Sequence, residues 1–261
     1  MTDRPTPTSE QLAFAEQMAA YPFRFCDPVI VGRHVDLVGS GAAAVWGGSG
    51  TMILLGGRVC LATSLHNLEY YEKKFKEDNS TLFQFSNVAF DPLDRVISRS
   101  NTLDLCTIDL TGLAIERPAI PDFGLPALRP LTPAAWPPRE VQLGERVFFA
   151  GWPGAYRQIR DGGRELLHNG SSFIGIPVTG FGGDQFSCKF DRSTWIAGGL
   201  NADINDNELG GFSGCPIFRE PDTGAVEDSE LVGFVKEYSE AFDQLIATNA
   251  AFLEPNATLS R

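Results

Sequence analysis

Seven prolines lie between residues 115 and 140 of this 261-residue chain, at positions 118, 121, 126, 130, 133, 137 and 138. Proline fixes φ and lacks an amide hydrogen, so such a stretch can be neither a helix nor a central strand. It divides the chain into two halves of similar size, each long enough to bury a core. We therefore expect residues 118–140 to connect two folded units, 29–117 and 141–261, with residues 1–28 as an N-terminal helical arm.

Both halves have the composition of short strands joined by turns. The chain has 27 glycines and 17 prolines, spread among Val, Ile, Leu, Phe and Thr, which favours β structure over a helical bundle. Residues 42–63 read as strands, with a bend at residues 47–50 and a two-residue hairpin turn at Gly56-Gly57. Further strands are expected within residues 81–90, 103–110, 144–153, 171–181, 185–190, 215–218, 231–238 and 245–252.

Two helices are expected beside the strands. In residues 8–21, Phe14 and Met18 share one helix face, and Thr8 and Gln11 form a capping pattern. This helix is either a partner-docking arm or a helix packed on the outside of the body. The second helix, residues 68–78, places its lysines on a solvated face rather than in a binding patch.

Charge and cysteine content narrow the function classes. The formal net charge is −12 and no basic patch is present, so we expect no nucleic-acid partner. No apolar run is long enough to span a membrane and no leader pattern opens the sequence, so we expect no membrane association and a cytoplasmic location. The five cysteines are an odd number without a C-x-x-C pair, which indicates reduced structural thiols and no metal site or cofactor.

Three residues have the chemistry of nucleophilic catalysis. His66 ends a predicted strand, Asp104 begins another, and Ser213 lies in the glycine-rich run of residues 210–216. Glycines permit a tight turn in which a serine hydroxyl is exposed and two backbone N–H groups converge. A histidine can then accept the hydroxyl proton, and a carboxylate can orient the histidine. Asp109 is the rival carboxylate, but its odd spacing from Asp104 places it on the opposite strand face.

The other two histidines, His34 and His168, are interpreted as surface or loop residues.

Four segments together resemble the chymotrypsin-like (trypsin-fold) serine peptidases. GSGTMILLGGRVCLATSLHN is similar to the family segment that delivers the catalytic histidine, DLCTIDL to the strand that carries the aspartate, GFSGCPIF to the nucleophile loop, and LVGFV to the strand that follows. GERVFFAGWP resembles the first strand of the family's second barrel. The resemblance implies two six-stranded antiparallel β-barrels and a catalytic triad of His66, Asp104 and Ser213.

The resemblance also implies the remaining parts of the site. The N–H groups of Gly211 and Ser213 would form the oxyanion hole. Lys236, Glu237 and Tyr238 would form the strand along which a substrate backbone pairs. The floor of the specificity pocket would come from residues 201–208, which include Asn207 and three acidic residues that favour a basic substrate side chain. Tyr238 stands where many relatives have glycine, which speaks against a wide pocket.

Three departures from the family pattern bear on the setting. Asn67 replaces the cysteine that secreted members use for a disulfide, which agrees with an intracellular, bacterial-type member. Phe212 replaces the aspartate that pairs with a new N-terminus after zymogen cleavage, so we expect packing of Phe212 to hold the oxyanion loop. Cys215 replaces a glycine and is interpreted as a buried apolar filler.

The sequence therefore predicts a serine endopeptidase that acts on polypeptides through an acyl-enzyme, with a separate partner protein for any regulation. Two alternatives stay open. One is a catalytically inactive peptide-binding or scaffold module in which Tyr238 fills the pocket. The other is an esterase-like hydrolase of small acyl substrates.

Overall fold

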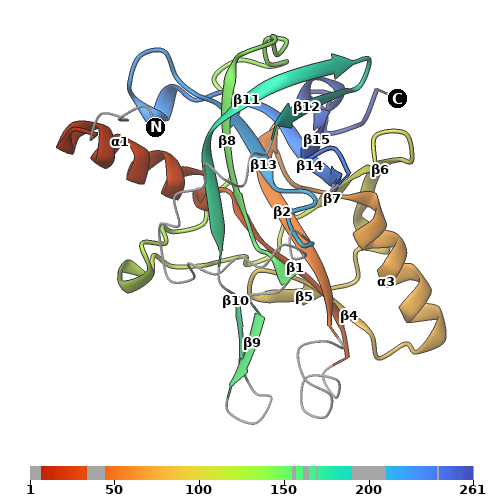
Figure 1. Ribbon diagram of the computed structural model, residues 1–261. Coiled ribbons are helices and arrows are strands. Elements are labelled where there is room, and N and C mark those ends of the chain that lie inside the picture. Colours follow the sequence, from red (N-terminus) through yellow and green to blue (C-terminus); the bar gives the residue numbers. More distant parts are fainter. Residues whose placement is uncertain are drawn as a thin grey trace.

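The computed structural model of the chain (Figure 1) describes residues 7–33, 45–154, 157–160, 165–168, 170–189, 210–239 and 241–260. The β-strands among these residues form two units joined by an extended connector. Within the described residues, no helix is long and apolar enough to cross a membrane.

The expected N-terminal helix is confirmed as α1 (Ser9–Ala20). Thr8 Oγ1 accepts a hydrogen bond from the Gln11 backbone, and the Gln11 side chain accepts one from the Thr8 backbone, so the predicted capping box is present. The short 3₁₀ helix η1 (Tyr21–Arg24) follows because Pro22 cannot continue the α-helical hydrogen bonding. Met18 is buried, and α1 contacts strands of the second unit, so the helix packs on the body.

The first unit is a curled antiparallel sheet of seven strands in the order β5-β4-β1-β2-β3-β7-β6. The strands are β1 (Cys26–Gly32), β2 (Trp46–Leu55), β3 (Arg58–Thr63), β4 (Leu82–Phe85), β5 (Val88–Phe90), β6 (Val96–Ser100) and β7 (Leu105–Asp109). Between β3 and β4 lies helix α3 (Leu65–Glu77), at the right of Figure 1, and the 3₁₀ helix η3 (Leu93–Arg95) precedes β6. The predicted hairpin turn at Gly56-Gly57 is confirmed, with positive φ at both residues.

The predicted bend at residues 47–50 is wrong, because β2 runs through all four positions. The glycines there serve close packing instead of a turn. A Cβ atom at Gly48 would collide with the side chain of Asn67, and one at Gly50 would lie 2.5 Å from Leu61. Because these two positions have no side chain, neighbouring elements can approach the strand closely.

The proline-rich connector crosses the first sheet before it enters the second unit. It contains the 3₁₀ helix η4 (Pro121–Phe123). Leu131 then exchanges backbone hydrogen bonds with Met52 and Leu54 of β2, at 2.8 Å each. These hydrogen bonds satisfy the backbone groups of β2 that lie beyond β1, because β1 pairs only with residues 46–51.

The second unit is a closed six-stranded barrel with the ring order β11-β12-β15-β14-β13-β8. Its strands are β8 (Arg146–Gly151), β11 (Ser171–Gly182), β12 (Gln185–Lys189), β13 (Pro216–Arg219), β14 (Leu231–Ser239) and β15 (Gln244–Asn249). A separate hairpin, β9 (Arg157–Arg160) and β10 (Glu165–His168), extends below the barrel in Figure 1. The 3₁₀ helices η8 (Val226–Asp228) and η9 (Ala250–Phe252) flank β14 and β15.

One hydrophobic cluster joins the two units. Ile53 and Leu55 of β2 pack in the same cluster as Phe148 of β8 and Phe218 of β13. The rings of Phe148 and Phe218 stack with centroids 5.6 Å apart. Because this cluster belongs to both sheets, it fixes their relative position. The predicted all-β class with two β units is confirmed: the second unit is a closed six-stranded barrel, and the first is a curled sheet of seven strands.

Candidate active site

His66 lies in the first turn of α3, three residues after the end of β3. Leu65 and Leu68 on either side of it are buried against the sheet. Because His66 lies between these two anchors on a different helix face, its side chain stays 37% exposed. The local sequence thus places an imidazole at the surface on a rigid helix start.

Asp104 holds His66 at two points. Its Oδ2 atom lies 2.8 Å from His66 Nδ1, and its Oδ1 atom accepts a 3.1 Å hydrogen bond from the His66 backbone amide. The Asp104 carbonyl accepts a third bond from the Leu65 amide, at 3.1 Å. Asp104 has a φ of 48°, a left-handed conformation that aspartate tolerates better than most residues.

This pairing determines which ring nitrogen can act as a base. An ionised carboxylate only accepts hydrogen bonds, so the Nδ1–Oδ2 contact requires the proton on Nδ1 of the neutral ring. Nε2 is then the unprotonated nitrogen and can accept a proton. Among the described residues, no group forms a hydrogen bond with Nε2.

Ser213 lies in a turn that both β units hold in place. Ser49 of β2 donates its hydroxyl to the Gly211 carbonyl at 2.7 Å, and its amide donates to the Ser213 carbonyl at 3.0 Å. Thr51 of β2 donates to the Gly214 carbonyl at 3.0 Å. From the second barrel, the Val235 carbonyl accepts from the Gly214 amide at 2.8 Å.

The glycines at 211 and 214 have φ values of 106° and 90°, which side chains other than hydrogen rarely permit. A Cβ at Gly214 would collide with the Ser49 carbonyl and lie 3.0 Å from the Ser64 amide. The turn of residues 211–214, called the nucleophile turn, therefore packs directly against Ser64. Ser64 is the N-cap residue of α3 and lies two positions before His66.

Two N–H groups in this turn are available to a ligand. The amides of Gly211 and Ser213 have no acceptor among the described residues, whereas the amides of Gly214 and Cys215 are both bonded. Phe212 between them is buried, and its ring packs against Phe149 and Phe173 with centroids 5.9 and 5.5 Å away. The packing of the Phe212 ring in the core thus holds the turn in place, as the sequence predicted.

The Ser213 hydroxyl does not contact His66 in this structure. Its Oγ atom donates a 3.2 Å hydrogen bond to the carbonyl of Lys236. Lys236 occupies a β-bulge in β14, because Val235 and Glu237 pair with consecutive residues of β15. The bulge turns the Lys236 carbonyl toward the nucleophile turn. The structure therefore joins His66 to Asp104 and packs the turn that carries Ser213 against Ser64, without a hydrogen bond between His66 and Ser213.

The predicted substrate strand is paired differently on its two sides. Residues 237–239 of β14 pair with β15 on one side, while β13 pairs with the other side only as far as Phe234. Among the described strands, none pairs with Lys236 or Glu237 on that second side. The Tyr238 hydroxyl donates a 2.6 Å hydrogen bond to Asp243 at the end of the same hairpin.

Several predicted residues lie outside the described part of the chain. They are Asn207, the acidic residues Asp203, Asp206 and Glu208 of the expected pocket floor, and His34. His168 is half-buried at the end of β10.

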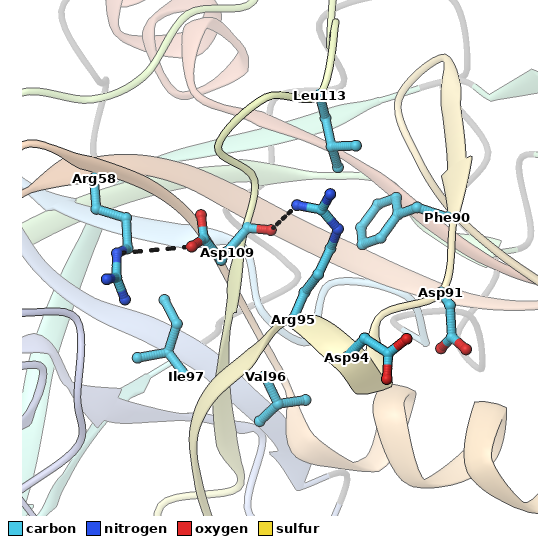
Figure 2. A pocket seen from close by; sticks show the side chains of 9 residues that line it. All are labelled: Arg58, Phe90, Asp91, Asp94, Arg95, Val96, Ile97, Asp109 and Leu113. Carbon is cyan, nitrogen blue, oxygen red and sulfur yellow. Dashed lines mark hydrogen bonds and ion pairs between the residues drawn. The ribbon is translucent and has the colours of Figure 1, made fainter.

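Asp109, the rival carboxylate, is separated from the predicted triad. Asp109 lies at the far end of β7, five residues from Asp104, which is roughly 16 Å along a strand. Its carboxylate forms an ion pair with Arg58 at 3.7 Å, within an open hollow of about 750 Å³ that Arg95 and Phe90 also line (Figure 2). Cys215 is fully buried, and burial raises its thiol pKa well above the usual value, so it carries no reactive thiolate.

All five cysteines are free and buried. Among the described residues, no three His, Cys, Asp or Glu side chains are arranged to hold a metal ion.

Two residues that the sequence did not predict hold the nucleophile turn from the opposite unit. Ser49 and Thr51 are fully buried polar residues of β2, and both donate hydrogen bonds to the nucleophile turn more than 160 residues away. Their signal in the sequence was a small hydroxyl side chain at alternate positions of a strand. That pattern does not identify a partner.

No known protein-family model matches the chain, and no curated protein matches it. Three similar solved structures are the human heparin binding protein, Deg5 and the Tobacco Etch Virus protease complexed with product. Their sequence identities are 15%, 14% and 12%, and each has a TM-score of 0.44. The alignments cover 90%, 94% and 94% of this chain and 91%, 92% and 77% of those chains. Identities and TM-scores this low support no inference about activity.

Proposed function

We propose that this protein is a serine endopeptidase in which Ser213 is the nucleophile, His66 the general base and Asp104 the residue that orients His66. The observation that carries the proposal is the two-point contact between Asp104 and His66, at 2.8 and 3.1 Å. It fixes both the ring and the backbone of a surface histidine whose other nitrogen is open. A structural histidine needs no such arrangement beside a glycine-rich serine turn.

In the proposed reaction, His66 Nε2 accepts the Ser213 hydroxyl proton as Oγ attacks the scissile carbonyl. The same nitrogen then gives that proton to the leaving amine. When the amine departs, the acyl group stays on Ser213 as the acyl-enzyme. Water repeats the two steps and releases the acid. Asp104 stabilises the imidazolium that forms in each half of the reaction.

The open amides of Gly211 and Ser213 support the proposed oxyanion hole. They belong to one turn that four inter-element hydrogen bonds and the packing of Phe212 hold rigid. Preorganised N–H groups stabilise developing negative charge because they need no reorientation during the reaction.

The end of the β13 pairing at Phe234 supports a polypeptide substrate. An extended chain would continue that side of β14 at Lys236 and Glu237, close to Ser213, whose hydroxyl is bonded to the Lys236 carbonyl. The five free cysteines support the proposed cytoplasmic location, since disulfides are rare in reducing compartments.

One observation favours an inactive peptide-binding module as the second candidate. The Ser213 hydroxyl is bonded to the Lys236 carbonyl, so activity requires rotation of this side chain toward His66. In the proposed enzyme, substrate binding favours that rotation to another staggered rotamer. In an inactive module the hydroxyl keeps its bond to Lys236.

Labelling with a fluorophosphonate probe separates these candidates, because only an activated serine reacts. We expect one covalent adduct on Ser213, lost in Ser213→Ala and strongly slowed in His66→Ala. Ser80→Ala, at an exposed serine next to α3, serves as the matched control and keeps the adduct. An unlabelled wild-type protein that is folded by circular dichroism would exclude the enzyme. Comparison of ester with peptide turnover then tests the esterase alternative.

A further inference from the structure

Trp46 is an exposed aromatic residue held in a single orientation beside His66. It begins β2, and 42% of its surface is exposed. Its indole is stacked on Tyr70 of α3 with centroids 4.8 Å apart and planes 20° from parallel. The indole also meets the His66 ring edge-on, with centroids 6.4 Å apart and an interplanar angle of 85°. Rigid exposed aromatic rings are typical anchors of binding sites.

A buried amide holds the indole from below. Trp46 Nε1 donates a 3.1 Å hydrogen bond to Oδ1 of Asn67, which is fully buried. The Asn67 Nδ2 atom in turn donates to Thr63 Oγ1 at 3.2 Å, which fixes the orientation of the amide. Gly48 leaves room for this side chain, since a Cβ there would collide with it. The indole is thus preorganised before any ligand arrives.

The position of the indole relative to His66 determines which part of a substrate it meets. This step rests on the proposed function. His66 gives its proton to the leaving amine, so the residues that follow the scissile bond must lie on the His66 side of Ser213. The indole packs against the His66 ring, with centroids 6.4 Å apart, and this contact favours the same side.

The neighbouring charge favours an apolar ligand over a cation. The Lys74 ammonium lies 5.9 Å from the centre of the Tyr70 ring that stacks on Trp46. The chain's own cation therefore already uses this aromatic pair for a cation–π contact, and repels a second one. We propose that Trp46 binds the side chain of the residue directly after the scissile bond and selects an aromatic or large apolar residue there.

Acyl transfer to added amines tests this without knowledge of the natural substrate. p-Nitrophenyl acetate acetylates Ser213 and releases p-nitrophenol, so the leaving group is gone before the measured step. An amino-acid amide then competes with water. Its nitrogen bonds to the acetyl carbon, the bond to Oγ breaks, and the amine proton passes through His66 Nε2 to Oγ. The ratio of acetylated amide to acetate reports how well each amine binds on the leaving-group side.

We expect the wild-type protein to prefer phenylalanine amide over glycine amide by about tenfold. Partial burial of one large apolar side chain stabilises the bound amine by that factor. Arginine amide should resemble glycine amide. Trp46→Ala should abolish this preference, which is measured as the ratio of the two transfer rates, so any effect of the indole on His66 itself cancels. Phe181→Ala removes another aromatic residue, 64% exposed on β11, and should leave the preference intact.

Each other outcome has a definite meaning. If the wild-type protein forms no acetyl-enzyme and takes no fluorophosphonate label, the proposed function fails and this inference fails with it. If acetyl-enzyme forms but Trp46→Ala keeps the preference, Trp46 does not contact the ligand and the function stands. If Trp46→Ala slows transfer to water, glycine amide and phenylalanine amide equally, the indole only supports His66, and the inference is likewise overturned.

Discussion

The hydroxyl of Thr248 in the closed barrel donates a 2.6 Å hydrogen bond to the carbonyl of Leu103, the residue that precedes Asp104 in the other unit. Both residues are almost fully buried. The Lys236 ammonium makes a second contact to this turn, at 3.1 Å from the Thr102 carbonyl. The second barrel therefore holds the turn that carries Asp104, just as β2 of the first sheet holds the turn that carries Ser213.

Replacement of Thr248 by valine tests the role of this contact. Thr248→Val keeps the shape but leaves the buried Leu103 carbonyl without its partner, so we expect a loss of about 1–3 kcal/mol in the free energy of unfolding. Fluorophosphonate labelling should also slow, because the Asp104 turn is less well held. Urea denaturation and labelling rates measure the two effects. Thr179→Val, at an exposed threonine of β11, should change neither.

The choice between the two carboxylates of the β7 region can be tested directly. Asp104→Asn should slow labelling of Ser213 by about ten-thousandfold, because an amide beside Nδ1 favours the wrong ring tautomer. Asp109→Asn removes a carboxylate from the same strand but only affects the ion pair with Arg58. We expect it to label at the wild-type rate. Equal rates for both variants would contradict the assignment of Asp104.

Steric contact at the nucleophile turn gives a stability prediction. Gly214 and Gly224 both have positive φ, 90° and 74°, but only Gly214 has neighbours where a Cβ would stand. Gly224→Ala should cost about 1–2 kcal/mol from backbone strain alone. Gly214→Ala should cost about 1–3 kcal/mol more, since its Cβ overlaps backbone atoms of Ser49 and Ser64. Thermal or chemical unfolding measures the difference, and equal losses would contradict the close packing.

Asp27 of β1 predicts a pH dependence of stability. Burial raises its pKa to about 6, although Arg117, whose Nε lies 2.9 Å away, lowers it in part. Between about pH 4 and 6 the unfolded carboxyl loses its proton while the folded one keeps it. The folded state then binds more protons, so its stability falls as pH rises through this range.

Asp27→Asn cannot ionise and serves as the control. The stability difference between wild type and variant should shift by about 3 kcal/mol against the wild type from pH 4 to pH 7. Urea denaturation at several pH values measures it. A difference that is constant over this range would show that Asp27 titrates alike in both states.

Much of the local structure could be predicted because it depends on residues close in sequence. The Thr8–Gln11 capping box, the Gly56-Gly57 turn and most strands followed from such patterns. Strands β1, β6, β9 and β10 were missed, since their sequences lack clear alternation of apolar and polar residues. Residues 47–50 were taken for a bend, because glycine is ambiguous between a turn and a closely packed strand.

The sequence by itself determined the all-β class, because backbone preference is a local property. It also predicted the division at the prolines, and it identified His66, Asp104 and Ser213 as candidates from their residue chemistry. Only the tertiary structure decided that Asp104 holds His66 at two points and that the Ser213 hydroxyl turns to Lys236. It alone also brought Ser49, Thr51 and Thr248 to turns of the opposite unit. These contacts join residues up to 163 positions apart, and they exist only because one shared hydrophobic cluster fixes how the two sheets meet.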